Sequence, residues 1–253
     1  MIDFQNVSFS YGEESSGGGI RNVNLTINTG EFVLLTGESG CGKTTITRLV
    51  NGLVPHYYEG NLEGDVLLDG KSVSDTPLYD LAAMVGSVFQ NPKSQFFNVD
   101  TDSELAFACE NLGYPQEDIL KRIDRTVSDY HIEDLMGRSV FALSGGEKQK
   151  IACASSSVLL PGIMVLDEPS SNLDMAAIDD LRQVLSLWKK QGKTILIAEH
   201  RLYYLHDLAD RVLYVKDGEI EREYTPAEFD SLSDSTLSLI HISEPTRRVV
   251  ISY

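Results

Sequence analysis

Residues between positions 37 and 45 combine the types and the spacing that could bind a phosphate group. Gly37, Gly42, Lys43 and Thr44 fit the pattern G-x-x-x-x-G-K-[ST]. Glycines let several backbone N–H groups converge on one anion, and a helix over residues 43–53 would add the positive end of its dipole. In this pattern the lysine reaches the β- and γ-phosphates of a nucleotide, and the threonine hydroxyl binds Mg²⁺. The loop residues that we expect to contact the nucleotide are Gly37, Ser39, Gly40, Cys41, Gly42, Lys43, Thr44 and Thr45.

Two adjacent acids follow an apolar run later in the chain. Residues 163–166 predict a buried strand, and Asp167 and Glu168 come directly after it. Because α/β sheets bind ligands at the carboxyl ends of their strands, we expect both acids at the phosphate site. Asp167 suits the coordination of Mg²⁺, directly or through water. Glu168 suits the attacking water, either as a general base or as the group that polarises it.

A third candidate set lies at residues 143–149, which read Leu-Ser-Gly-Gly-Glu-Lys-Gln. Ser144 predicts the N-cap of a helix that runs from Gly145 towards residue 159. Two glycines in the first turn leave the free N–H groups unobstructed, so this helix start is a second potential anion site. We therefore add Ser144, Gly145, Gly146 and Glu147 to the candidate nucleotide contacts.

The elements that must position these residues alternate between strands and helices. Apolar runs at 163–166, 194–198 and 211–216 predict buried strands, and residues 175–191 predict a helix between two of them, which together indicate an α/β fold. Strands near 2–9, 22–28 and 65–68 suggest a mixed sheet in the first part of the chain. A short strand over 84–89 leads to Gln90. Residues 93–143 predict only helices, at 102–112 with Thr101 or Asp102 as its cap and at 116–130.

The length, amino-acid composition and net charge of the chain limit its possible functions. The chain has 253 residues, 42% of them apolar, which is enough for one domain with a full-sized core. The formal net charge of −17 disfavours nucleic acid, which requires a basic face. A basic protein partner and a merely soluble surface both remain compatible with it. No apolar run reaches the roughly 18 residues of a membrane-spanning helix, and no signal peptide precedes the first strand.

The three cysteines, Cys41, Cys109 and Cys153, have no metal-binding spacing, which indicates a reducing compartment. Cys41 lies in the phosphate loop at the start of a helix. We expect that position to lower its pKa and to make it the most reactive thiol.

The stretch 143–149 resembles the signature motif of the ATP-binding cassette (ABC) ATPases, and the other motifs of that family follow in the family's order over residues 1 to about 230. The resemblance implies a P-loop α/β fold with a mixed or parallel core sheet, an antiparallel N-terminal β subdomain and a helical subdomain inserted at about 91–160. It implies ATP and Mg²⁺ as ligands. It gives catalytic roles to Lys43, Gln90, Glu168 and His200, and metal contacts to Thr44, Gln90 and Asp167.

Two further nucleotide contacts are implied by the resemblance alone. Tyr11 falls where the family stacks an aromatic ring on adenine, and Asp174 ends a stretch that looks like the D-loop. Plainer interpretations exist: Tyr11 could be an ordinary strand-end aromatic, Gln90 a loop cap and His200 a satisfied surface histidine.

In the family, two cassettes close head to tail on two ATP molecules, so Ser144, Gly145 and Gly146 would act on the nucleotide of a second cassette, whether identical, different or fused. Residues 55–60, 89–97 and 198–201 also resemble the ATPases of energy-coupling-factor (ECF) importers of vitamins or metal ions. That likeness implies a transmembrane coupling protein, a substrate-binding membrane protein and a location at the cytoplasmic face of the plasma membrane. In the family, the groove beside Gln90 receives a coupling helix with basic residues. Four acids near this groove would complement such a helix: Asp100, Asp102, Glu104 and Glu110. A helix face exposed to solvent would explain the same acids equally well.

The alternatives are the ATPase of another ABC transporter and a soluble ABC ATPase of DNA repair or translation. A cassette that binds ATP without turnover is a third interpretation, and four intact site residues argue against it: Lys43, Asp167, Glu168 and His200. Repair types carry a long coiled coil that is absent from this sequence, and translation types require a basic surface. Residues 237–253 resemble a translated sequencing adapter, so we exclude them from the fold and expect the natural C-terminus beyond about 236 to be missing. The expected division is a cassette at 1–230 and a tail at 231–253.

Overall fold

The computed structural model describes residues 1–12 and 18–232. Four strands form an antiparallel sheet in the order β2-β1-β4-β5. Their bounds are Ile2–Tyr11 (β1), Gly19–Ile27 (β2), Gly60–Leu68 (β4) and Lys71–Ser72 (β5). The antiparallel N-terminal sheet that the family resemblance implied is confirmed, whereas the mixed sheet suggested by the strand pattern is wrong. The strand before the phosphate loop belongs to the second sheet and not to this one. All five of its residues are buried, so it requires a sheet that is covered on both faces.

The second sheet has six strands in the order β10-β9-β3-β8-β7-β6. All neighbours run parallel except β10 against β9, so the core sheet is mixed, as expected. Predicted strands at 194–198 and 211–216 match to the residue. The bounds are Phe32–Thr36 (β3), Val85–Val88 (β6), Ile163–Asp167 (β7), Thr194–Ala198 (β8), Arg211–Lys216 (β9) and Glu219–Tyr224 (β10).

Helices α1 (Lys43–Val50) and α7 (Met175–Lys190) pack against the core sheet. The helix expected over 43–53 stops at Val50, because Gly52 adopts a left-handed φ of 76° before a short helix, α2 (Leu53–His56). Helix α3 (Leu78–Met84) was not predicted, and it takes Met84 from the start of the expected strand. The remaining short elements are α8 (Pro226–Asp230) and the 3₁₀ turns η1 (Pro92–Ser94), η2 (Glu133–Leu135) and η3 (Val140–Ala142).

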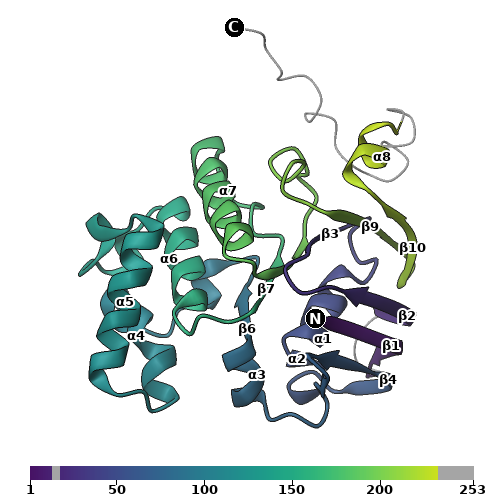
Figure 1. Cartoon of the computed structure of the whole chain (residues 1–253), viewed down its shortest axis with the longest axis horizontal. Coiled ribbons are helices and arrows are strands. Elements are labelled where there is room, and N and C mark those ends of the chain that lie inside the picture. The colour runs from purple at the N-terminus through teal and green to yellow at the C-terminus, as the bar shows by residue number, and fades with distance from the viewer. Residues whose placement is uncertain (13–17, 233–253) are drawn as a thin grey trace, which may run out of the picture.

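Three helices, α4 (Thr101–Asn111), α5 (Gln116–Tyr130) and α6 (Gly145–Ser157), gather on the side of the molecule away from the antiparallel sheet (Figure 1). The cap of α4 is Asp100, whose carboxylate accepts the Ser103 N–H at 2.9 Å, and not Thr101 or Asp102 as expected. The Tyr130 hydroxyl donates to Ser157 Oγ at 2.6 Å and accepts from the indole of fully buried Trp188. These bonds join α5, α6 and α7.

No helix within residues 1–12 and 18–232 is long and apolar enough to cross a bilayer. The stretch 237–253, for which we expected an adapter origin, lies outside the described residues.

Candidate functional site

The predicted site residues converge at one edge of the core sheet. Because β3, β6, β7 and β8 are parallel, their carboxyl ends lie at the same edge. The phosphate loop follows β3, and Gln90 follows β6. Asp167 ends β7 with Glu168 directly after it, and His200 follows β8.

The phosphate loop is compact around Lys43, which is 4% exposed. Its Nζ donates to the carbonyls of Gly37 and Glu38, each at 2.8 Å. Gly37 has a φ of 147°, and a Cβ there would lie 2.1 Å from the Val215 carbonyl, so only glycine fits. Helix α1 begins directly at Lys43, and its first-turn N–H groups have no partner inside the helix. The loop thus presents a lysine and a helix N-terminus at the same place.

Cys41 does not have the lowered pKa that the sequence predicted. The side chain is 7% exposed, and its Sγ lies 3.7 Å from Lys43 Nζ. Burial raises the pKa of the thiol, and the nearby ammonium only partly opposes this effect. Desolvation therefore outweighs the cation and the helix dipole on which the expectation rested.

The hydroxyl of Thr44, the residue after Lys43, contacts Asp167 at the end of β7. Thr44 Oγ1 donates to Asp167 Oδ1 at 3.1 Å. Burial, and to a smaller degree the charge of Glu168, raises the pKa of Asp167, and the Thr44 hydrogen bond opposes this effect. Oxygen donors beside such a carboxylate fit Mg²⁺. Within residues 1–12 and 18–232 no cluster of three or more His, Cys, Asp or Glu could hold a metal alone, so the ion would take its remaining ligands from phosphate oxygens and water.

Glu168 is the centre of the polar contacts at this edge. Its Oε1 lies 3.0 Å from His200 Nε2, and its Oε2 accepts a hydrogen bond from Gln90 Nε2 at 2.9 Å. The His200 hydrogen bond lowers the pKa of Glu168. The backbone of Glu168 has a φ of 44°, a left-handed value that costs energy in a non-glycine residue and is concentrated at functional sites. Three segments distant in sequence thus meet at one carboxylate.

The signature stretch starts α6 with a capping box. Ser144 Oγ accepts the Glu147 N–H at 3.2 Å, and the Glu147 carboxylate accepts the Ser144 N–H at 2.6 Å. Arg138 donates to the same carboxylate at 2.8 Å. These bonds lower the pKa of Glu147 to about 2, so Glu147 has a structural role whether or not it meets a nucleotide. A Cβ on Gly146 would lie 2.7 Å from that of Ala177, which requires glycine where α6 approaches α7. Ser144 and Gly145 are exposed.

Asp174 and Tyr11 also make internal contacts. Asp174 caps α7 by accepting the Ala177 N–H at 2.9 Å. The Tyr11 hydroxyl lies 3.2 Å from Thr45 Oγ1 and accepts from Arg48 at 3.0 Å. Its ring meets the rings of Phe9 and Tyr58 edge to face. A hydroxyl fixed to α1 places the Tyr11 ring beside the phosphate loop.

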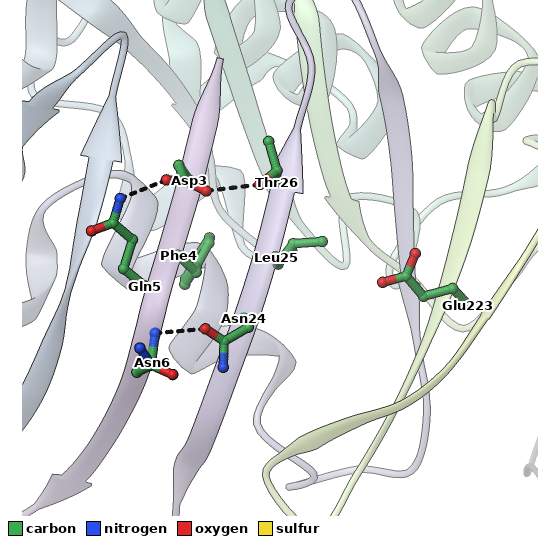
Figure 2. A pocket seen from close by; sticks show the side chains of 8 residues that line it. All are labelled: Asp3, Phe4, Gln5, Asn6, Asn24, Leu25, Thr26 and Glu223. Atoms are coloured by element: carbon green, nitrogen blue, oxygen red, sulfur yellow. Dashed lines mark hydrogen bonds between the residues drawn. The ribbon is translucent and has the colours of Figure 1, made fainter.

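Two of the grooves formed by the described residues lie near the antiparallel sheet. One, of about 710 Å³, runs along the phosphate loop at Ser39, Gly40 and Cys41, and Lys216 also lines it. The other, of about 450 Å³, contains none of the predicted site residues (Figure 2). There Asp3 is already hydrogen-bonded to Gln5 and Thr26, each at 2.8 Å. Only the first groove adjoins the converging motifs.

One of the four acids expected to receive a basic helix is not available. Glu104 is 4% exposed, and its Oε2 accepts the N–H groups of Phe97 and Asn98 at 3.0 and 2.8 Å. It fixes the loop after Gln90 and does not face solvent. Sequence reasoning included Glu199 and Arg201 only in the stretch 198–201 that resembles ECF ATPases, and it gave neither residue a role.

Comparison with known proteins identifies the family. The ABC transporter domain model matches residues 20–171. A protein of Treponema denticola named as an ABC transporter ATP-binding protein is 47% identical over 94% of this chain and 48% of its own length. A Pyrococcus abyssi protein with the same description is 40% identical over the whole chain and 90% of its own length. The chain spans about half the length of the first curated relatives that it matches.

Solved structures agree with this result. The cbiO1 protein of Clostridium perfringens, part of the ABC transporter complex cbiONQ, superposes with a TM-score of 0.80 at 26% identity, covering 96% of this chain and 95% of that one. The cassette MJ0796, solved as a dimer in a post-hydrolysis state with ADP and Pi, gives a TM-score of 0.75 at 26% identity, covering 89% of this chain and 99% of that one. The fold and the converging motifs define a P-loop nucleotide-binding cassette. The chain belongs to the ABC transporter family, as one of its ATPase cassettes.

Proposed function

We propose that this cassette binds Mg-ATP and hydrolyses it to power a membrane importer of the energy-coupling-factor type, which takes up a vitamin or a metal ion. Residues 1–230 would form the cassette, with residues of about 91–160 as its helical subdomain. The observation that supports hydrolysis most directly is the Glu168 carboxylate, which contacts both His200 and Gln90.

The chemistry assigned to each residue follows from its position. ATP would lie along the phosphate loop, with its triphosphate on Lys43 and the N–H groups of the first turn of α1. Thr44 and Asp167 would hold Mg²⁺, and a metal contact from Gln90 would use its amide oxygen, because its amide nitrogen donates to Glu168. The magnesium ion supplies charge neutralisation of the phosphates.

Glu168 would accept a proton from the attacking water as a general base. A glutamate is ionised at neutral pH at its ordinary pKa, and the His200 hydrogen bond lowers that pKa further. The ionised carboxylate is the form that accepts a proton. His200 would orient this carboxylate and contact the γ-phosphate by hydrogen bonding. The proposed catalytic set is thus Lys43, Gln90, Glu168 and His200.

A second cassette would complete the site. Ser144 and Gly145 are exposed at the start of α6, as a trans-acting phosphate contact requires. The dimeric MJ0796 cassettes support this arrangement. The partner could be a second copy, a different cassette or a second half of a longer chain, since the Treponema relative has about twice the aligned length.

The membrane coupling protein would dock beside the loop that follows Gln90. Three large apolar side chains are solvent-exposed in this region: Phe97 (75%), Val99 (63%) and Phe141 (77%). Phe97 stacks on Phe107 with ring centroids 4.8 Å apart, and Val140 N–H donates to the Val99 carbonyl at 2.8 Å, so the patch is held by α4 and η3. Exposed apolar groups on this scale favour a protein partner. The likeness to cbiO1 supports a location at the cytoplasmic face of the plasma membrane.

Purification of the tagged chain together with the membrane proteins bound to it tests the proposal. We expect a complex that contains a transmembrane coupling protein and a small substrate-binding membrane protein, with ATP-dependent uptake of its solute in liposomes. A complex with ATPase activity but with a different class of membrane partner would contradict the ECF assignment. It would leave the assignment of the chain as a transporter ATPase unchanged. Purification of an active ATPase with no membrane partner would favour a soluble ABC ATPase.

A further inference from the structure

Glu199, which precedes His200, connects the end of β8 to the turn after β7. Its side chain is 2% exposed. Oε1 accepts hydrogen bonds from the backbone N–H groups of His200 at 2.8 Å and Arg201 at 3.1 Å. Oε2 accepts from the Ser170 N–H at 3.2 Å and from the Tyr204 hydroxyl at 2.9 Å. A buried carboxylate is stable only where donors surround it, so Glu199 fixes these two segments against each other.

Arg201 connects the same two segments through carbonyl groups. Its guanidinium NH1 donates to the Ser170 carbonyl at 3.2 Å and to the Leu173 carbonyl at 3.1 Å. Ser170 is therefore held at its N–H by Glu199 and at its carbonyl by Arg201. The two residues that flank His200 in sequence therefore hydrogen-bond to the N–H and to the carbonyl of the same residue in the turn after β7.

The turn held by Glu199 and Arg201 comprises residues 168–174. It connects the edge of the core sheet at which the predicted site residues converge to the exposed start of α7. It starts at Glu168, whose carboxylate contacts His200 at 3.0 Å, and it ends at Asp174, the exposed cap of α7. Its middle lies against α6, since a Cβ on Gly145 would be 3.8 Å from the Asn172 carbonyl. Glu199 and Arg201 therefore form the hydrogen-bonded link between this turn and the backbone beside His200.

We propose that Glu199 and Arg201 are positioning residues that keep His200 aligned with the turn 168–174, so that contact of this turn with a second cassette sets the geometry between His200 Nε2 and the Glu168 carboxylate. The inference rests on the proposed function, because it takes residues 171–174 to face that second cassette. Neither residue has to touch the nucleotide. Both act through the position of His200.

Arg201→Ala tests the inference in the intact chain, because the side chain lies at the surface and its loss leaves no cavity. We expect kcat for ATP to fall between about 10- and 100-fold, as for a displaced catalytic group, with KM and nucleotide binding within about twofold. Arg182→Ala is the matched control. Arg182 also contacts the loop between β8 and β9, since it donates to the Tyr204 carbonyl at 2.8 Å and to Asp207 at 2.6 Å. These partners lie outside the turn 168–174. We expect its kcat to change by less than about twofold.

A double mutant separates positioning from general loss of structure. In a His200→Ala background, adding Arg201→Ala should reduce the residual single-turnover rate by less than about twofold, because a residue that acts through His200 has nothing left to position. Independent, multiplying losses would overturn the inference, as would an unchanged kcat in Arg201→Ala. Thermal unfolding of each variant reports folding, and Glu199→Gln, which places an amide donor against donors, should reproduce the kcat loss. A wild-type chain without ATPase activity would overturn the proposed function itself together with this inference.

Discussion

At the scale of single residues, the contacts of Glu168 make the sharpest prediction. Glu168→Gln keeps the size of the side chain but removes its basicity. We expect ATP binding within about twofold of wild type and a turnover that falls at least about 100-fold, the usual contribution of a general base. Equilibrium binding of a fluorescent nucleotide and steady-state phosphate release would measure the two effects. Near-normal turnover would exclude Glu168 as the base.

Cys41 should react slowly, contrary to what its place in the phosphate loop suggests. Burial raises its pKa, so the fraction present as the reactive thiolate at pH 7.5 is reduced. We expect iodoacetamide to modify Cys41 in the folded protein more slowly than in the same protein unfolded in guanidinium chloride, with mass spectrometry as the readout. Cys109 and Cys153, both fully buried, serve as internal references. Faster labelling of Cys41 in the folded than in the unfolded protein would contradict the raised pKa and favour an activated thiolate in the loop.

At the scale of elements, the capping box of α6 predicts a pH dependence of stability. The pKa of Glu147 is about 2 in the folded chain against 4.5 as its ordinary value. Since the folded pKa is the lower one, the carboxylate stabilises the fold above pH 4.5, and this contribution is lost as the pH falls from 4.5 towards 2. Glu147→Gln should therefore flatten the acid limb of a stability profile measured by urea unfolding.

The chain contains a matched control for this effect. Glu228 forms the same kind of capping box with Thr225 in the short helix α8, without an arginine partner. Glu228→Gln should alter the acid limb less than Glu147→Gln does. Equal effects would mean that the ion pair with Arg138 adds nothing to the cap.

The two helix starts that could bind phosphate should respond differently to mutation. Lys43→Ala removes a charge-assisted phosphate contact, so the isolated cassette should lose nucleotide affinity. Ser144→Arg places a bulky cation at the exposed start of α6. It should leave nucleotide binding to the isolated cassette intact but prevent the ATP-dependent pairing of two cassettes, visible by size-exclusion chromatography. If both variants weakened binding equally, Ser144 would act on the nucleotide of its own cassette.

The sequence predicted the elements where one physical signal dominated. The runs at 194–198 and 211–216 are apolar and bounded by turns, and β8 and β9 match them to the residue. Helix α3 was missed because residues 78–84 carry no strong cap or period. The burial of Cys41, Glu104 and Glu199 was also missed. Burial of such groups depends on partners brought together by the fold, such as Ser170 and Tyr204 around Glu199, and spacing in one sequence does not reveal them.

At the scale of the whole molecule, the net charge of −17 predicts how pairing depends on salt. Two identical copies would repel each other, and the Debye length falls from about 30 Å at 0.01 M to about 8 Å at 0.15 M ionic strength. For a pair of identical cassettes, the ATP-dependent dimer of Glu168→Gln should therefore become tighter as salt rises over this range, measured by analytical ultracentrifugation. A dimer that weakens with salt would indicate that local attraction across the interface outweighs the net charge.

The order of strands in the core sheet has a consequence for biosynthesis. In the sheet, β3 lies between β8 and β9: Phe32 is opposite Ile195, and Val33 is opposite Arg211. A ribosome therefore makes the apolar strand that carries the phosphate loop long before it makes either neighbour. At roughly 5–20 residues per second, the delay is about ten to thirty seconds. For most of that interval β3 lacks both of its neighbours, so its apolar side chains need a chaperone or another temporary cover to avoid aggregation.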